Sequence, residues 1–119
     1  HYVGNNMEIS KETIDYVLSF SEDRDWKQFH NPKDLALSLS LEASELLELF
    51  QWLGSDEAVK KNKEKMREEL ADVIVYAIDF ADALGFEDLD GLIMEKMKKN
   101  EEKYPLTKAK GSNKKYTEL

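Results

Sequence analysis

The 119-residue sequence contains no cysteine, two prolines and five glycines. Without cysteine the chain can form neither a disulfide nor a thiolate metal site, which agrees with a reducing cytoplasm. No apolar run approaches the roughly 20 residues that span a bilayer, and no signal-peptide pattern is present, so we expect a soluble cytoplasmic protein without membrane partners. Because 17 basic residues face 25 acidic ones, for a net charge of -8, the composition also disfavours nucleic-acid binding.

The scarce prolines and glycines fall where helices are expected to begin or end. Pro32 follows Asn31, a good N-cap residue, while Gly54 and Gly85 each follow an apolar run and Pro105 ends another. No alternating strand pattern is present. The sequence therefore predicts four helices and an irregular tail: 10–23, 32–53, 55–84 with a break near Lys61, 88–104, and the tail 105–119.

Residues 1–6 precede Met7 without any periodic pattern, and we interpret them as the remnant of an expression tag. Residues 7–119 are then expected to form one domain. The segment 32–53 carries apolar residues on more than one face, whereas a surface helix of a monomer needs a single apolar stripe. We therefore expect an all-α four-helix bundle that is completed by a second subunit, as a dimer or a dimer of dimers.

One carboxylate of the segment 32–53 lies where an apolar residue is expected. Acidic pairs three residues apart share a helix face, but several such pairs occur, so this spacing alone selects none of them. Glu42 differs because it lies on the apolar seam between Leu39 and Leu46, where the spacing alternates between four and three residues. Glu45 lies one turn further on, on a flanking stripe.

The segment 55–84 has a comparable arrangement. Its apolar stripe consists of Leu70, Ile74, Ala77, Ala81 and Leu84. Glu69, Asp72 and Tyr76 are expected along the edge of that stripe, with Val73 beside them. Two facing helices would then bring four carboxylates together.

Carboxylates are rarely buried without a partner, since removing a charge from water is costly. The partner could be a cationic side chain, a proton or a divalent cation. The segment 32–53 contains one basic residue, Lys33, near its start, which favours the cation. Oxygen ligands suit magnesium, manganese or calcium, and His30, the only histidine after the first six residues, precedes this segment, which disfavours zinc and di-iron. The alternative is that these acids edge the core and reach solvent.

Five stretches resemble the MazG-type all-α nucleoside triphosphate pyrophosphohydrolases, and among these the dCTP pyrophosphatase branch: RDWKQFHNP, SLEASELLELFQW, REELADVIVYAIDFA, KMKKNEEKYP and KGSNKKYTEL. The resemblance runs from Arg24 to Leu119, and its most specific part is Glu-x-x-Glu followed by FQW and then Glu-x-x-Asp. It implies a Mg²⁺ site, which Mn²⁺ could also fill, with one carboxylate as the base. Its implied ligands and catalytic residues are Glu42, Glu45, Glu69 and Asp72, and Glu48 matches a further acidic position.

The resemblance also implies that a metal-activated water cleaves a dNTP between the α and β phosphates, giving dNMP and pyrophosphate in nucleotide-pool house-cleaning. The residues implied around base and sugar are Trp26, His30, Trp52 and Tyr76, and those implied toward phosphate or sugar are Lys96, Asn100, Lys115 and Tyr116. For Trp52 and Tyr76 the alternative is core packing, and for the basic tail it is a solvated segment.

Two residues depart from the family pattern. Val17 stands where the dCTP-cleaving branch has a histidine, which weakens the expectation of a strict dCTP preference. Asp79 looks particular to this chain, with no expected role beyond a polar bundle edge or a subunit contact. Two other functions stay open: a non-catalytic helical interaction module, and a dUTPase-like hydrolase that accepts nucleoside diphosphates.

Overall fold

The computed structural model describes residues 7–111, which form helices and no strand. The predicted all-α class is therefore confirmed for this part of the chain. The chain divides after Gly85 into two compact units, each described here by itself. That residues 7–119 form one domain stays a prediction, and residues 1–6 lie outside the described part. No helix within residues 7–111 has both the length and the apolar character that crossing a bilayer requires.

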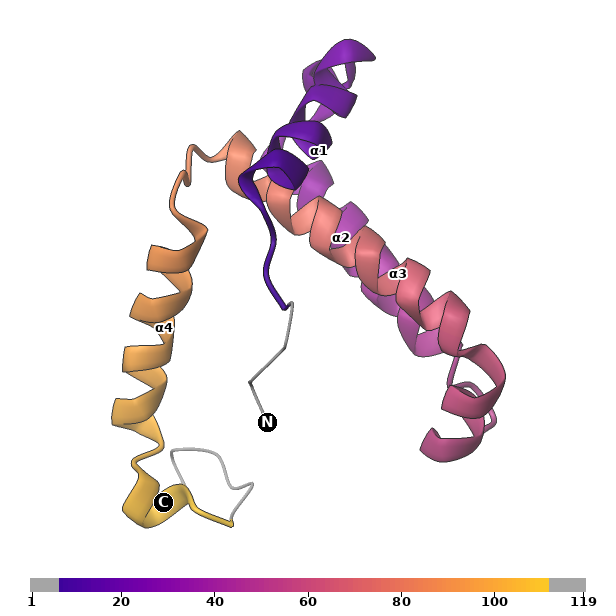
Figure 1. Ribbon diagram of the computed structural model, residues 1–119, viewed down its shortest axis with the longest axis vertical. Helices are drawn as coiled ribbons and strands as arrows, with labels where there is room; N and C mark the ends of the chain where they lie inside the picture. Colours follow the sequence, from indigo (N-terminus) through magenta and orange to yellow (C-terminus); the bar gives the residue numbers. More distant parts are fainter. Residues whose placement is uncertain (1–6, 112–119) are drawn as a thin grey trace. The chain divides into compact units, whose positions relative to one another are not determined.

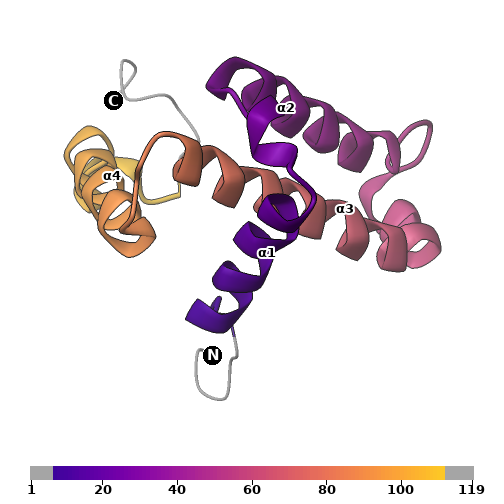
Figure 2. The ribbon, with the colours of Figure 1, turned by 90° about the horizontal axis from the view of Figure 1, so that it is seen from above.

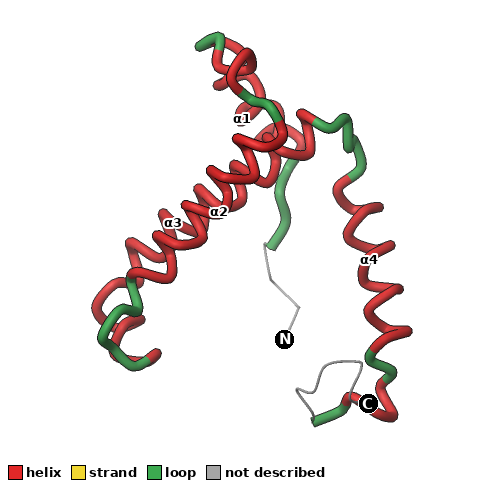
Figure 3. Tube along the Cα trace, turned by 180° about the vertical axis from the view of Figure 1, so that it is seen from behind, coloured by secondary structure: helices red, strands yellow, loops and turns green. Residues whose placement is uncertain are grey.

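Within residues 7–85, the first unit contains three helices and one short helical turn. They are α1 (Lys11–Asp23), the 3₁₀ helix η1 (Trp26–Phe29), α2 (Pro32–Glu48) and α3 (Ser55–Ala83). Helices α2 and α3 run side by side along most of their length, as Figure 1 and the opposite view in Figure 3 show. Helix α1 packs against α3, which is clearest from above in Figure 2. The first unit is thus a small bundle around the α2–α3 pair.

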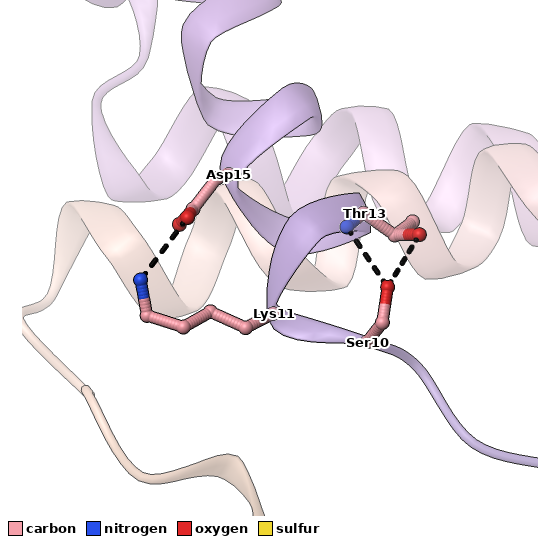
Figure 4. A network of polar contacts seen from close by, with 4 residues as sticks. All are labelled: Ser10, Lys11, Thr13 and Asp15. Atoms are coloured by element: carbon pink, nitrogen blue, oxygen red, sulfur yellow. Dashed lines mark hydrogen bonds and ion pairs between the residues drawn. The ribbon is translucent and has the colours of Figure 1, made fainter.

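Helix α1 begins where the sequence predicts. The Ser10 hydroxyl oxygen accepts a hydrogen bond from the backbone N–H of Thr13 at 3.1 Å, which satisfies a free donor of the first turn. Lys11, the first residue of the helix, forms an exposed ion pair with Asp15 at 3.1 Å (Figure 4). These contacts are local, so the start of α1 can be predicted from sequence.

Helix α2 also begins as predicted, since the Asn31 side chain accepts a hydrogen bond from the backbone N–H of Asp34 at 2.9 Å. Its predicted end at Leu53 is wrong, because the α-helix ends at Glu48 and a series of turns follows. Trp52 has a φ of 66°, outside the range of a right-handed helix. Gly54 therefore marks the end of this series of turns, whereas the α-helix itself ends at Glu48.

Helix α3 is kinked at Asn62, where φ is -122° and ψ is 17°. The predicted break near Lys61 is thereby confirmed. The partly buried Asn62 amide donates a hydrogen bond to the backbone carbonyl of Leu49 at 2.9 Å. That carbonyl lies just past the end of α2, so the contact links the kink to the α2–α3 connection.

Replacing Asn62 with alanine is expected to destabilise the protein by about 1–2 kcal/mol, because the Leu49 carbonyl loses its donor. Urea denaturation followed by circular dichroism measures the change in unfolding free energy. The control is Lys61→Ala, which removes an exposed neighbouring side chain and should cost little. Equal effects of the two substitutions would contradict a structural role for the amide.

The apolar seam predicted on α2 is confirmed. Leu35 is buried, and the other members of the seam are partly buried: Leu39, Glu42, Leu46, Leu49 and Leu53. The leucines off this seam are exposed, with Leu37 at 54%, Leu41 at 64% and Leu47 at 70%. Glu42 therefore occupies an inward-facing position in a row of leucines.

The predicted apolar stripe of α3 is mostly exposed in this unit. Of this stripe only Ala81 is buried, while Leu70 and Ile74 are 49% and 38% exposed. Along the predicted edge of that stripe, Glu69 and Tyr76 are partly buried and Asp72 is exposed. An apolar stripe in the sequence predicts that one face of a helix is covered, but it does not identify the helix or subunit that covers it. Within the first unit, the contacts of α1 and α2 leave the leucine and isoleucine stripe open.

The second unit contains α4 (Leu89–Lys103) and the short α5 (Leu106–Ala109). The side chain of Asp88 caps α4 by accepting a hydrogen bond from the backbone N–H of Gly91 at 2.9 Å. The predicted irregular tail is wrong for the four residues of α5, a single helical turn that carries no strong sequence signal. Pro105 separates the two helices, as expected.

Candidate metal centre

Three of the four predicted ligands meet between α2 and α3. Glu42 of α2 and Glu69 and Asp72 of α3 each offer one carboxylate oxygen, and these oxygens lie within 4.8 Å of one another. Glu42 and Glu69 are partly buried, whereas Asp72 is exposed. Because the two helices run side by side, residues that are far apart in sequence supply one compact group of oxygen atoms.

Two of these carboxylates carry buried oxygens that lack a donor. The Oε2 atoms of Glu42 and Glu69 are buried and form no hydrogen bond. None of the ion pairs within residues 7–111 includes a member of the cluster. A buried carboxylate oxygen without a partner is costly, so the arrangement calls for a proton or a cation.

The pKa values of Glu42 and Glu69 also indicate a site that calls for a proton or a cation. A carboxyl–carboxyl hydrogen bond with Glu45, then burial, then the charges of Glu45 and Asp72 raise the pKa of Glu42 to about 7. Burial, followed by the hydrogen bond and charge of Glu45, also raises the pKa of Glu69. Glu45, the fourth predicted ligand, is exposed and lies beside both. Without a cation, the cluster therefore holds protons well above the usual pH range of carboxyl groups.

A divalent cation fits this group of residues. It would displace the shared protons, satisfy the two buried oxygens and offset the repulsion among the carboxylates. The donors are all oxygen atoms, which suits magnesium and manganese, and no histidine or cysteine joins the group within the described residues.

The aromatic residues predicted around the nucleotide lie in different settings. Tyr76 is partly buried on the face of α3 that carries Glu69. Trp26, in η1, is 46% exposed and meets the Phe20 ring edge-on, with 5.7 Å between ring centroids. Trp52 is 92% exposed, so core packing, the alternative for this residue, is wrong.

The remaining predicted residues are spread along the chain. His30 is partly buried at the start of the loop before α2, and Glu48 is exposed at the end of α2. Lys96 is exposed and Asn100 partly buried on α4, in the second unit. Lys115 and Tyr116 lie outside the described residues. The roles of all these residues stay predictions.

Sequence reasoning missed the connection between α1 and α2. It predicted neither η1 nor the ion pair that joins η1 to α3, in which Lys27 Nζ lies 3.4 Å from Asp82 Oδ2. Asp25 begins this connection with a φ of 56°, a conformation for which its residue type is only a weak signal. The sequence also suggests a polar bundle edge or a subunit contact for Asp79, whereas its side chain is buried within the chain.

A family model and several curated proteins match this chain. The MazG-like family model matches residues 37–119, which include all four predicted carboxylates. This chain belongs to the MazG-like family. Two dCTP pyrophosphatase 1 proteins, from Mus musculus and Homo sapiens, are each 40% identical to it over 105 residues, covering 84% of this chain and 61% of their own length. The chain thus spans about three fifths of the curated relatives it matches.

A solved structure supports the MazG-like fold. A pyrophosphatase from Archaeoglobus fulgidus superposes with a TM-score of 0.75 at 36% identity, covering 87% of this chain and 98% of that one. The MazG-like resemblance predicted from sequence is confirmed by these findings. The matched family region begins after Trp26 and His30, so the connection that carries these two residues lies outside it.

Proposed function

We propose that this MazG-like chain hydrolyses nucleoside triphosphates to nucleoside monophosphates and pyrophosphate, with Mg²⁺ or Mn²⁺ as cofactor. The observation that carries the proposal is the group of three carboxylates from two helices, two of them with buried oxygens that lack a donor. The names of the relatives, dCTP pyrophosphatase and pyrophosphatase, support the same class of reaction.

Glu42, Glu69 and Asp72 would hold the cation between α2 and α3. When bound, the cation supplies Lewis acidity toward a phosphoryl oxygen and makes a water molecule more acidic. Glu45 lies beside Glu42 and Glu69 but is exposed, so it can accept the proton of the attacking water and release it to solvent. The acidic cluster would repel a free triphosphate, and the cation is what makes its approach favourable.

The leading substrates are dCTP and its modified forms, with other dNTPs as further candidates, in cytoplasmic house-cleaning of the nucleotide pool. The names of the curated relatives support dCTP. Val17, in place of the histidine of the dCTP-cleaving branch, favours a broader base preference. In this proposal the aromatic and basic residues implied by the family resemblance contact base, sugar and phosphates.

The active form is proposed to be a homo-oligomer, a dimer or a dimer of dimers. The support comes from the open apolar stripe of α3, represented by Leu70 and Ile74, and from the exposed leucines Leu37, Leu41 and Leu47 of α2. So many large apolar side chains on one small unit are typical of a surface that another subunit covers.

A pyrophosphate-release assay across all dNTPs and NTPs with Mg²⁺ tests the function. We expect cleavage of at least one dNTP, with monophosphate and pyrophosphate as the products. If no dNTP is cleaved and Glu42→Gln leaves Mg²⁺ binding unchanged, the chain is instead a non-catalytic helical module. Comparing the products from dUDP and dCTP separates the pyrophosphohydrolase from a dUTPase-like enzyme.

The stability of the metal-free protein is expected to fall as the pH rises from about 4.5 to about 7. The pKa of Glu42 is raised from 4.5 to about 7 in the folded protein, so the folded state binds the extra proton within this interval and loses that advantage above it. Thermal unfolding in EDTA at a series of pH values measures the effect. Added Mg²⁺ should raise the midpoint most at high pH, where it does not compete with protons. A metal-free midpoint that rises through this interval would contradict the prediction.

A further inference from the structure

Phe20 lies where the end of α1 meets the connection to α2. Its ring meets the Trp26 ring edge-on, with 5.7 Å between the ring centroids and 73° between the ring planes. The guanidinium carbon of Arg24 lies 3.6 Å from the centroid of the same Phe20 ring. Phe20 therefore contacts two side chains of the segment that follows it. The proposed hydrolysis assigns no task to Phe20 or Arg24, so these contacts require a separate explanation.

Arg24 contacts Phe20 in two ways. Besides lying over the ring, the guanidinium donates a hydrogen bond from Nη1 to the Phe20 backbone carbonyl at 3.0 Å. That carbonyl belongs to the last turn of α1, where the helix itself supplies no donor, and the backbone N–H of Arg24 donates to Glu22 instead. A guanidinium that is tied to the backbone and stacks on an aromatic face restricts the rotation of that ring.

The Trp26 side chain needs a neighbour to hold it. Trp26 begins the four-residue helix η1, which is too short to be stable in isolation, and its side chain is 46% exposed. The ion pairs that Lys27 of η1 forms with Glu22 and Asp82 join exposed side chains and contribute little. The edge-on contact with Phe20, in contrast, has a geometry that aromatic pairs prefer. Phe20 is therefore suited to fix the orientation of the Trp26 ring.

We propose that Phe20, held by Arg24, is a positioning residue that keeps the Trp26 ring in one orientation. A half-exposed indole ring offers an aromatic surface on which a flat heteroaromatic ring such as a nucleobase can stack. Fixing the indole before the ligand arrives lowers the entropy cost of binding. The link to the base rests on the proposed function, whereas the orientation of Trp26 does not.

Kinetics of Phe20→Leu test the link to the nucleotide. Leucine is apolar but lacks the ring that meets Trp26, so KM for the best dNTP should rise roughly five- to tenfold while kcat changes less than about threefold, as for a loss of binding alone. Phe20→Tyr keeps the ring at a position that is 38% exposed, and its KM should stay within about twofold of the unsubstituted protein. An unchanged KM in Phe20→Leu, or an equal rise in both variants, would overturn the proposed role.

The matched control is Tyr16→Leu. The Tyr16 ring also pairs with Phe20, tilted and with 6.5 Å between the centroids, but it is 69% exposed and lies one turn earlier on α1. Removing it keeps the contact between Phe20 and Trp26, so KM should change less than about twofold. A rise equal to that of Phe20→Leu would mean that any lost ring contact loosens this end of α1, and it would overturn a specific role for Phe20.

A double-mutant cycle tests the part assigned to Arg24. If Arg24 acts through Phe20, Arg24→Gln should raise KM less than Phe20→Leu does and should add little to it in the double variant, because both substitutions disrupt the same stack. Additive effects on KM would mean that the guanidinium acts on the substrate independently of Phe20, and they would overturn its role in holding the ring.

A fluorescence experiment tests the orientation of Trp26 without any substrate. In a Trp52→Phe background Trp26 is the only tryptophan, and Phe20→Leu should lower the anisotropy of its emission and increase its quenching by acrylamide. Arg24→Gln should act in the same direction and serves if Phe20→Leu does not fold. Unchanged anisotropy and quenching in both variants would overturn the proposal. A more mobile Trp26 in variants of a protein that cleaves no nucleotide would instead refute the proposed function and keep the positioning.

Discussion

Replacing Glu42 with glutamine is expected to abolish hydrolysis and, at the same time, to stabilise the metal-free protein. The carboxylate of Glu42 joins those of Glu69 and Asp72 in the candidate metal centre, with oxygens within 4.8 Å of one another. Removing one charged ligand weakens the cation site and lowers its ability to polarise a phosphoryl oxygen. We expect kcat to fall at least about 1,000-fold, as for other electrostatic groups that act in the transition state.

The gain in stability follows from the same geometry. Without a cation, Glu42 has a buried oxygen that lacks a donor and two like charges nearby. A glutamine amide carries no charge and can donate hydrogen bonds to Glu45 or Glu69, which removes both penalties. The thermal midpoint in EDTA should therefore rise above that of the unsubstituted protein. Added Mg²⁺ should no longer raise it.

The control for this pair of effects is Glu68→Gln. Glu68 is exposed, precedes Glu69 on α3 and is outside the three-residue cluster. It should change neither the rate nor the response of the midpoint to Mg²⁺. If Glu42→Gln loses activity and also has a lower metal-free midpoint, the substitution has damaged the fold. That result would contradict the claim that the Glu42 carboxylate destabilises the metal-free protein.

Local patterns were sufficient to predict much of the fold and the centre of the site. The caps of α1 and α2 depend on contacts within one turn, and the Glu42 position is visible because a carboxylate interrupts a leucine seam. The direction that each face of α3 takes depends instead on which neighbours cover it. Because those neighbours belong to other segments of the chain, the sequence predicts the apolar stripe of α3 but not which neighbour covers each face.

The connection between α1 and α2 could not be predicted for a related reason. Its course depends on the left-handed conformation of Asp25 and on the ion pair of Lys27 with Asp82, more than 50 residues away in sequence. The burial of Asp79 is also not predictable from sequence, since a charged residue is expected at the surface. The parts of the site that escaped prediction are thus those held by contacts between distant segments.

Replacing Ile74 with glutamate is expected to convert the proposed oligomer into monomers. Ile74 and Leu70 belong to the stripe of α3 that the α1 and α2 contacts leave open, and they are 38% and 49% exposed. An unpaired carboxylate within an apolar subunit contact costs roughly 3–5 kcal/mol per buried charge. A small interface that loses this much binding free energy dissociates. Light scattering coupled to size-exclusion chromatography at micromolar concentration measures the mass.

The matched control is Lys60→Glu, which also introduces a carboxylate on α3 but at an exposed position before the kink. It should leave the mass unchanged. The assay for pyrophosphate release then shows what the second subunit contributes. Since the three clustered carboxylates come from one chain, a monomeric Ile74→Glu protein should still bind Mg²⁺. If it keeps the mass of the unsubstituted protein, the open stripe of α3 is not a subunit contact, and its large exposed side chains need another explanation.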